Sequence, residues 1–550
     1  GRARHHLRGG SRSRRQALLR AMAARAQGPV PPNDPQEAPA RRLAQWLRRK
    51  TTPTHVDISH RTKLILDNAE QTTVGGLTDA IGFGWYQAHM IAIVFGALMA
   101  ESSILQTVSS LVHAMSKDFG VSSSLARAAF VAFLFIGIQI GTLASGPLAD
   151  TIGRRWPLIV GYVGTLVFLV SAAFAGGVGA MYTLLLCLGI FCGLCVPCAL
   201  ITLSEVMPSP LRGVTNALVG GAFRIGALWS AVGLRLFMPD LKQGPWRFLL
   251  LWSGIPALLF LILSVASPAG RRDTPHFLAI KCRGRALVSV MNLMAKMNGR
   301  PELRLLHDSN VSFEHTPSAS IVEVATIMGT YPYWVYYLIM VVVFFAKEFV
   351  AGGSLAFWPL TFAQLEGFDA IAPATKLLIT VCISIPGVGI AMLVMDNLPR
   401  RRSLGLGAGL SAAGALMLLG IFGRAWQLGV AGIVLLQLFF PTWQMVAMLL
   451  PSELFPTEVR GWAFSLSFFL GRFGSEIAQV VVQSSQVGFP LVSGSLALLA
   501  VFLVHALPET KDAELINFTR SMESDETKKI ETKAAALGSY GAAMHGRTSP

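Results

Sequence analysis

Charged side chains stand inside long apolar runs of this 550-residue sequence, and five of them are candidates for a site: Arg224, Arg472, Glu101, Glu348 and Lys347. In hydrocarbon a charge costs roughly 2.5–3.5 kcal/mol even on the mildest insertion scale, so such residues usually line a pathway or a site. Arginine pairs bidentately with carboxylate or phosphate groups, and a buried glutamate pairs with a cation or carries a proton. These residue types therefore predict an interior site for an anionic group or a proton.

The spacing of these charges repeats along the chain. Arg224 follows Gly213 by 11 residues and Arg472 follows Gly461 by 11, which places each about 16 Å along a helix that rises about 1.5 Å per residue. The arginines are 248 positions apart (472 − 224), and the two glutamates are 247 apart (348 − 101). Two equivalent halves would therefore each supply one arginine and one glutamate near mid-membrane.

We hypothesise that Arg224 and Arg472 hold the anionic group of a solute, while Glu101 or Glu348 pairs with an arginine in the empty protein or takes a proton. A purely structural interpretation stays open, in which Arg472 pairs with Glu476 one turn away and Lys347 extends toward the interface or another helix. Three polar positions inside apolar runs could contact the solute or equally serve as interhelical hydrogen-bond partners: Gln139, Gln437 and Gln444.

The composition predicts that a membrane surrounds these charges. Hydrophobic residues make up 53% of the chain and charged residues only 14%, against about 25% charged in ordinary soluble domains. A bilayer core of about 30 Å needs about 20 apolar residues per helix. Twelve runs of that kind occur near 89–112, 125–148, 156–175, 180–204, 214–237, 247–267, 333–360, 373–395, 403–423, 427–451, 462–483 and 488–507.

The runs divide the chain into regions and predict an all-α membrane protein with twelve transmembrane helices in two pseudo-symmetric six-helix bundles. The expected regions are a basic, largely disordered tail (1–75), an N-terminal bundle (76–267), a linker (268–330), a C-terminal bundle (331–507) and a C-terminal tail (508–550). The arginine-rich start could also be a targeting segment. Lysine and arginine concentrate in the gaps on one side, so we expect the linker and both termini to be cytoplasmic.

Short charged motifs repeat at that side. The segment from Asp150 to Arg155 matches the segment from Asp396 to Arg401, and Glu205 with Arg212 matches Glu453 with Arg460. We expect carboxylate–guanidinium pairs between the halves to close this face as an inner gate, with a static brace as the alternative. The predicted gate comprises Gly146, Asp150, Gly153, Arg154, Arg155, Glu205, Arg212, Asp396, Arg400, Arg401, Glu453 and Arg460.

These motifs resemble the major facilitator superfamily. The segment 146–155 resembles its signature between helices 2 and 3, with Pro399 in place of the usual glycine in the second copy. Segments 274–278 and 507–511 resemble the sugar-porter and organic-ion-transporter branch, and segment 80–84 with Gln87 and Glu101 is most similar to its synaptic-vesicle-protein-related and niacin-transporter-like group. An arginine at the position of Arg472 is similar to the helix-11 arginine of organic anion transporters. The resemblance covers about residues 75–510 and implies alternating access between two bundles.

Together these features predict a multi-pass transporter of a small organic solute, in the first place an organic anion, with proton coupling left open. A sugar or organic cation facilitator, or a transporter-like protein with a binding or scaffolding role, is the alternative. The sequence shows no nucleophile triad and no phosphate loop, so we expect no enzyme activity, cofactor or metal. The basic residues lack interleaved aromatics, which argues against nucleic acid. We expect the solute and the lipid bilayer as partners, and a monomer as the functional unit.

Overall fold

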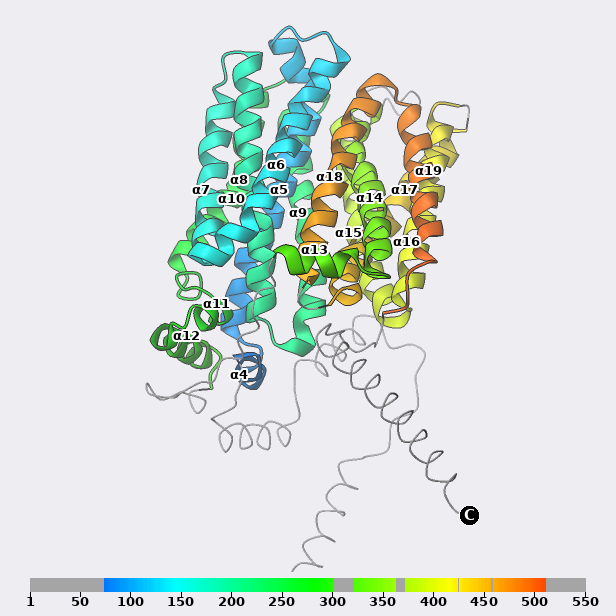
Figure 1. Cartoon of the computed structure of the whole chain (residues 1–550). Helices are drawn as coiled ribbons and strands as arrows, with labels where there is room; N and C mark the ends of the chain where they lie inside the picture. The colour runs from blue at the N-terminus through cyan, green and yellow to red at the C-terminus, as the bar shows by residue number, and fades with distance from the viewer. Residues whose placement is uncertain (1–73, 301–320, 363–370, 424, 457–458, 511–550) are drawn as a thin grey trace, which may run out of the picture. The chain divides into compact units, whose positions relative to one another are not determined.

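The computed structural model describes residues 74–300, 321–362, 371–423, 425–456 and 459–510. The expected N-terminal tail up to residue 73, part of the linker and most of the C-terminal tail lie outside the described residues. Within the described residues every regular element is a helix. Figure 1 shows the long helices running roughly parallel, with α11, α12 and α4 gathered at one end. We call this the linker end and the other the opposite end.

Twelve long helices form two groups of six. The first group is α5 (Trp85–Asp118), α6 (Ser124–Ile152), α7 (Arg155–Ala173), α8 (Val178–Val206), α9 (Arg212–Phe237) and α10 (Trp246–Ala266). The second is α14 (Tyr333–Phe362), α15 (Pro373–Asn397), α16 (Arg400–Met417) extended by η4 (Leu418–Ile421), α17 (Trp426–Leu454), α18 (Arg460–Ser484) and α19 (Gly488–Val504). Each predicted apolar run falls on one of these helices, so the predicted all-α, twelve-helix fold is confirmed.

Short helices fill the connections. They are α4 (Val74–Ile81), η2 (Ser209–Leu211), α11 (Pro275–Ile280), α12 (Gly284–Met297) and α13 (Ile321–Gly329). The segment after α10 is not an extended linker over its first part, because Leu287, Met291 and Met294 of α12 are buried with residues of α4 and α5. The side chain of Asn298 also accepts a hydrogen bond from the amide of Tyr86 at 3.1 Å. This part of the linker is therefore fixed to the first half.

Nine of the described helices are long and apolar enough to cross a membrane. The remaining three are α19, which has only 17 residues, and the two helices that carry the interior arginines, α9 and α18. A helix that faces lipid all round must be apolar all round, whereas one that borders a polar interior need not be. The two arginine helices are thus expected at the centre of the molecule, and the chain is a multi-pass integral membrane protein.

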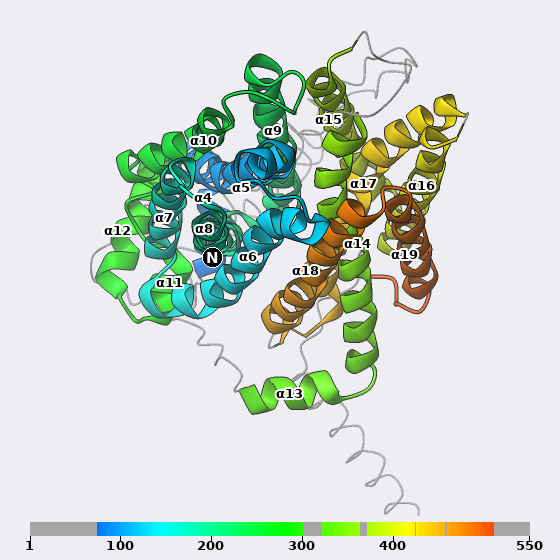
Figure 2. The ribbon, with the colours of Figure 1, turned by 90° about the horizontal axis from the view of Figure 1, so that it is seen from above.

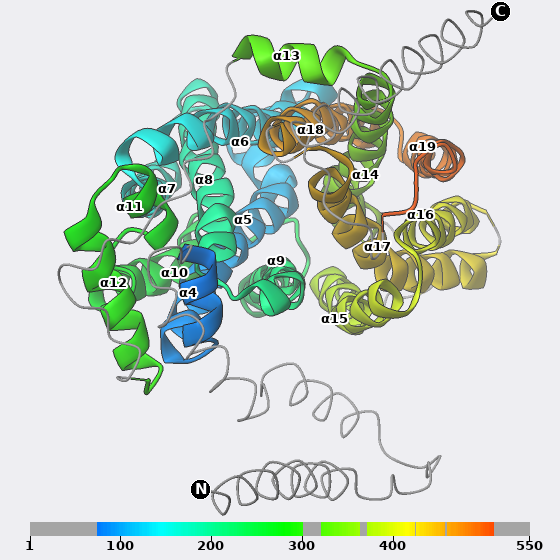
Figure 3. The same ribbon diagram turned by 60° about the horizontal axis from the view of Figure 1, so that its bottom comes forward.

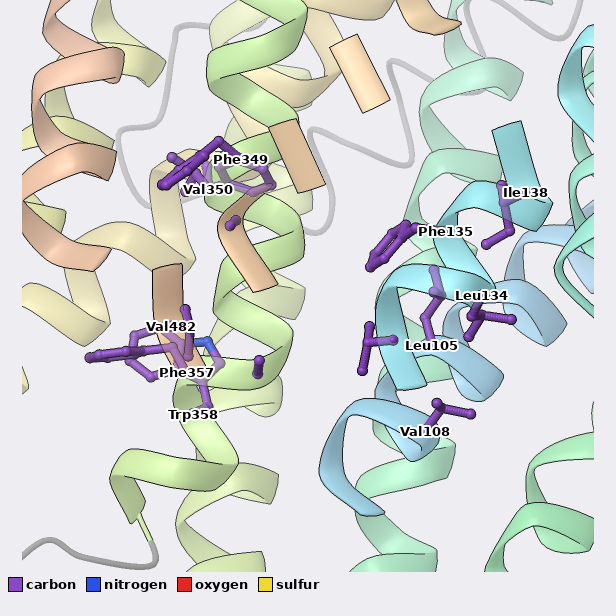
Figure 4. Close-up of a cluster of buried hydrophobic side chains, with 14 of the residues drawn as sticks. Leu105, Val108, Leu134, Phe135, Ile138, Phe349, Val350, Phe357, Trp358 and Val482 are labelled. Atoms are coloured by element: carbon purple, nitrogen blue, oxygen red, sulfur yellow. The ribbon is translucent and has the colours of Figure 1, made fainter. Parts of the chain in front are cut away.

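The boundary between the halves is formed by equivalent helices. Seen from above and from below, α6 lies beside α18 and α9 lies beside α15, while α7 and α10 lie away from the boundary (Figures 2 and 3). Ala227 and Ala231 of α9 form a buried cluster with Val381 of α15. Figure 4 shows side chains of one larger buried cluster, from Leu105 and Phe135 in the first half to Phe349 in the second. The arginine helices therefore border the contact between the halves.

Glycines bring neighbouring helices of a half into close contact. A Cβ added to Gly141 of α6 would lie 2.0 Å from the carbonyl oxygen of Ile190 in α8. The cysteines of α8 fill the contact with α7 on the other side: the Cys198 thiol donates to the carbonyl of Arg154 at 3.0 Å, and Cys195 lies 3.7 Å from that of Leu158. Small side chains let membrane helices approach closely, and here they fix α6, α7 and α8 as one unit.

We predict that Gly141→Ala destabilises the protein by about 1–3 kcal/mol, because the added methyl meets backbone that has to move. Gly146→Ala is the matched control on the same helix, since its Cβ would meet nothing within 4 Å. The control should be neutral or slightly stabilising. Thermal unfolding in detergent, followed by size-exclusion chromatography, measures both variants. Equal melting temperatures for the two would contradict this account of the α6–α8 contact.

Candidate substrate site

Four buried charges from three helices form one cluster, which we call the charge quartet: Glu101 of α5, Lys347 and Glu348 of α14, and Arg472 of α18. Nη2 of Arg472 lies 3.1 Å from Oε1 of Glu101, and Nζ of Lys347 lies 2.5 Å from Oε1 of Glu348. Nε of Arg472 lies 4.0 Å from Oε2 of Glu348, which links the two pairs. All four residues are less than 9% exposed. Two acids and two bases thus balance one another inside the protein.

Neighbouring side chains hold the quartet in place. The Ser475 hydroxyl lies 3.1 Å from Oε2 of Glu348 and 2.9 Å from the Glu348 carbonyl. The ring of Phe468 lies beneath both cations, 4.7 Å from the guanidinium carbon of Arg472 and 5.5 Å from Nζ of Lys347. Aromatic faces attract cations, most strongly where water is excluded. The quartet is therefore a satisfied network, apart from Nε of Arg472, which has no hydrogen-bond partner among the described residues.

The quartet also joins the two halves. Glu101 belongs to the first half and Arg472 to the second, and among the described ion pairs theirs is the one that crosses the boundary. The alternative pair with Glu476 within α18 is not among the described ion pairs, in which the partners of Arg472 are Glu101 and Glu348. Breaking a buried pair by removing one partner costs about 3–5 kcal/mol because the other charge stays buried. The pair thus stabilises the contact between the halves.

Arg224 lies outside the quartet. Its side chain, half-buried on α9, reaches across the boundary to α17, where Nη2 donates to Oε1 of Gln444 at 3.3 Å. The ring of Phe440 lies 5.5 Å from its guanidinium carbon. Among the described residues no carboxylate lies within ion-pair distance, 4.0 Å, of Arg224. The two arginines at equivalent positions therefore differ: Arg472 is neutralised by acids, and Arg224 meets only a neutral amide and a ring.

One residue breaks the symmetry. The counterpart of Glu101 in the second half is Glu348, which would be the equivalent partner for Arg224. Glu348 is instead engaged by Lys347, whose counterpart in the first half is the uncharged Ala100. The extra lysine uses the acid that symmetry would offer to Arg224. Of the five interior charges singled out in the sequence, four are brought together and one is left apart.

The three glutamines have different surroundings. Nε2 of Gln139 on α6 donates to the carbonyl of Phe469 on α18 at 3.3 Å, so it connects the halves. Gln444 accepts the hydrogen bond from Arg224 described above, and Gln437 is buried on the same helix. Gln444 thus belongs with the interior cation, whereas Gln139 acts as an interhelical partner.

The sequence reasoning missed a polar stripe on α5. The Ser102 hydroxyl donates to the carbonyl of Phe223 in α9 at 2.5 Å, and the hydroxyls of Thr107 and Ser230 are 2.6 Å apart. Gln106 donates to Ser110 on the same helix. The contacts to α9 hold α5 against that helix on both sides of Arg224, at Phe223 and at Ser230. The signal that could have found them is the density of serine, threonine and glutamine between 102 and 110, within a run otherwise long enough to span a bilayer.

At the linker end of the first half, Arg154 is the centre of a charged network. Its guanidinium lies 2.8 Å from Oε1 of Glu205 and 3.1 Å from the exposed carboxylate of Asp150. The Thr274 hydroxyl, just before α11, donates to Oε2 of Glu205. Asp273 accepts a hydrogen bond from the amide of Arg155 at 3.1 Å. The network therefore ties α6, α7 and α8 to the start of the linker.

Gly153 is required at this turn for two reasons. Its φ is +102°, in the region that side chains other than glycine rarely adopt. An added Cβ would also lie 2.5 Å from Oδ1 of Asp273. The equivalent position in the second half is Pro399, with φ −56°, so the second turn does without this conformation. Gly146 has open space around it.

The second half repeats the network in the same order. Nε of Arg400 lies 3.3 Å from Oε1 of Glu453, and the Thr510 hydroxyl donates to Oε2 of Glu453 at 2.5 Å. Glu509 accepts hydrogen bonds from the amides of Arg400 and Arg401 at 2.6 and 3.2 Å. Glu509 and Thr510 thus occupy the places of Asp273 and Thr274. Both segments resemble family motifs in the sequence, and the acid–threonine pair that they share is the signal that could have matched the two networks in advance.

The expected inner gate, in which such pairs cross between the halves, stays a prediction. The described ion pairs of these motifs join helices of one half, because α6, α7 and α8 in the first half and α15, α16 and α17 in the second bring arginine and glutamate together locally. Asp396 is exposed at the end of α15. The side chains of Arg212 and Arg460 lie outside the described residues. The contacts that the described residues make in these networks therefore brace each half.

We predict that Glu101→Gln and Arg472→Gln each destabilise the protein by about 3 kcal/mol, because each leaves one buried charge unpaired. The double variant should lose less than the sum of the two single losses, since no unpaired charge of that pair remains. Reversible unfolding in mixed micelles measures the three values. Strictly additive losses would show that the two side chains do not stabilise each other.

The exposed pair of Arg247 and Asp118, 2.9 Å apart, is the matched control for the buried pair. Both of its side chains are more than 40% exposed, and exposed pairs contribute about 0–1 kcal/mol. Asp118→Asn should therefore change stability little in the same assay.

Comparison with known proteins shows which family has this architecture. The profile of the family described as "Sugar (and other) transporter" matches residues 83–521. The probable metabolite transport protein CsbC of Bacillus subtilis is 23% identical over 76% of this chain and 90% of its own length. The rat solute carrier family 22 member 7 is 27% identical over 72% of each chain. The gallate transporter of Pseudomonas putida is 24% identical over 77% of this chain and 89% of its own.

Among solved structures, the partially occluded inward-open form of the xylose transporter XylE from E. coli superimposes with a TM-score of 0.62 at 19% identity. The superposition covers 78% of this chain and all of XylE. A related structure is described as a major facilitator superfamily proton:xylose symporter. With a family match over most of its length and this architecture, the chain has the major facilitator fold and belongs to the sugar (and other) transporter family.

Proposed function

We propose that this transporter carries a small organic anion across the membrane by alternating access, and that the anionic group binds Arg224. The observation that carries the proposal is the environment of Arg224: a half-buried guanidinium between the halves whose described contacts are the neutral Gln444 and Phe440. A cation in the interior of a membrane protein without a counter-charge favours an anionic ligand, and guanidinium pairs bidentately with carboxylate or phosphate. Arg472, the other arginine expected to bind the solute, is neutralised by Glu101.

The placement of Arg224 suits alternating access. It belongs to the first half and its contacts belong to the second, so a ligand bound there touches both halves. At the opposite end the amide of Ala374 donates to the carbonyl of Pro239 at 3.0 Å, which ties the halves together there. The braced networks at the linker end let each half move as a unit. Relative tilting of the halves would expose the site to either side in turn.

Basic residues at the linker end support the expected orientation, in which this end faces the cytoplasm. Arg154, Arg155, Arg271, Arg272 and Lys281 all lie there, and such an excess of basic residues is typical of the cytoplasmic side. We propose that both termini share this side.

An anion is favoured over a neutral sugar by the interior charges. Sugars are held by hydrogen bonds to amides and hydroxyls and need no guanidinium, and an organic cation would be repelled by Arg224. The relatives include both a gallate transporter and a glucose transporter, so their names alone do not decide the substrate. A binding or scaffolding role without transport is the remaining alternative, and saturable uptake is the observation that separates it.

A second mode of binding is supported by the pair of Arg472 and Glu101. An anion that displaces Glu101 from Arg472 would add a negative charge to the quartet, and a proton on Glu101 would restore neutrality. This mode predicts that uptake depends on an inward proton gradient and that Glu101→Gln uncouples the two. Binding at Arg224 needs no proton, because the guanidinium supplies the charge.

We predict saturable uptake of an organic anion by proteoliposomes, tested with benzoate, gallate and succinate against xylose and tetraethylammonium, each with and without a pH gradient. Arg224→Gln should raise KM for the transported anion by about tenfold or more, since a charge-assisted hydrogen bond contributes about 1.5–3 kcal/mol. Arg224→Lys should fall between wild type and Arg224→Gln, because lysine keeps the charge without the fork.

Arg285→Gln is the control, because it removes one positive charge from an exposed position on α12. It should leave KM unchanged. Uptake of xylose or tetraethylammonium without uptake of any anion would contradict the proposed substrate class, as would an Arg224→Gln variant with the wild-type KM.

A further inference from the structure

We infer that the transporter works as an anion exchanger, which carries one anion into the vesicle or cell each time that it carries another anion out. The inference rests on the proposed function, since it takes Arg224 as the anion site, and it adds the second substrate.

The interior charges described above do not balance around Arg224. The quartet is neutral as it stands, with ion pairs of 2.5 and 3.1 Å. Arg224 adds one positive charge whose described contacts are an amide at 3.3 Å and a ring at 5.5 Å. Glu476 lies one helical turn from Arg472, and it forms no described ion pair with Arg224. The site therefore carries an uncompensated positive charge when empty and none when it holds a monoanion.

Alternating access requires the site to pass through a state closed to both sides. Closing over an empty site strips water from the guanidinium of Arg224 with no counter-charge to replace it, which is unfavourable. Closing over a bound carboxylate desolvates a neutral pair that is held together by charge-assisted hydrogen bonds. The loaded protein should therefore change sides much faster than the empty one. Net uptake, which needs the empty site to return, becomes slow, and exchange becomes the fast mode.

The experiment measures trans-stimulation in proteoliposomes with benzoate, or with the panel anion that shows the highest uptake. Uptake of labelled anion should be at least about tenfold faster when the vesicles contain the same unlabelled anion, a ratio that corresponds to about 1.4 kcal/mol. A potential set by potassium and valinomycin should not change the exchange rate, since the loaded site is neutral. Equal uptake with and without internal anion would overturn the inference while leaving the proposed function intact. No anion uptake at all would overturn both.

Two variants test whether the charge of Arg224, and no other feature, causes the trans-stimulation. Gln444→Glu replaces the amide oxygen that accepts the hydrogen bond from Arg224 with a carboxylate oxygen. Because the empty site then has its counter-charge, the variant should show weaker anion uptake, and the remaining uptake should show no trans-stimulation. Glu476→Gln is the matched control for a change of one carboxyl group on α18, and it should keep trans-stimulation. Loss of trans-stimulation in Glu476→Gln, or full trans-stimulation in Gln444→Glu, would overturn the assignment. Size-exclusion profiles show whether each variant is folded.

Discussion

A charge in the middle of a membrane protein needs a counter-charge, and this constraint organises the centre of the molecule. Glu101 and Arg472 satisfy it for each other across the boundary between the halves, 3.1 Å apart. Lys347 and Glu348, which are neighbours in the sequence of α14, provide each other's counter-charge. Arg224 alone of the five is left to a neutral amide. A guanidinium in that position is stable only beside water or an anion. A solute can supply the anion.

The duplicated architecture explains both the likeness and the difference of the two arginines. Helices α9 and α18 occupy equivalent places at the boundary (Figure 2), and in the linker-end networks both Arg154 and Arg400 pair with a glutamate that also accepts a hydrogen bond from a threonine. Symmetry is lost at Lys347, whose equivalent position in the first half is Ala100. The rigid parts have thus stayed alike, and the difference lies where a solute would bind.

Much of this could be predicted from the sequence because it depends on local patterns. Apolar runs locate the twelve helices, and the run at 333–360 corresponds to α14 (Tyr333–Phe362). Helical rise places both arginines at the same depth. The choice of partners could not be predicted, because Arg472 finds Glu101 on a helix 371 positions away. The same holds for the gate motifs, whose arginines and glutamates meet within a half since α6, α7 and α8 pack side by side.

The most direct test of this account is an experimental structure of the protein with its transported anion, compared with one without it. The account predicts an anion oxygen at hydrogen-bonding distance from the guanidinium of Arg224, between α9 and α17, with the pair of Arg472 and Glu101 intact in both structures. An anion on Arg472 with Glu101 displaced, or a side chain of Arg224 that points toward lipid in both, would contradict it.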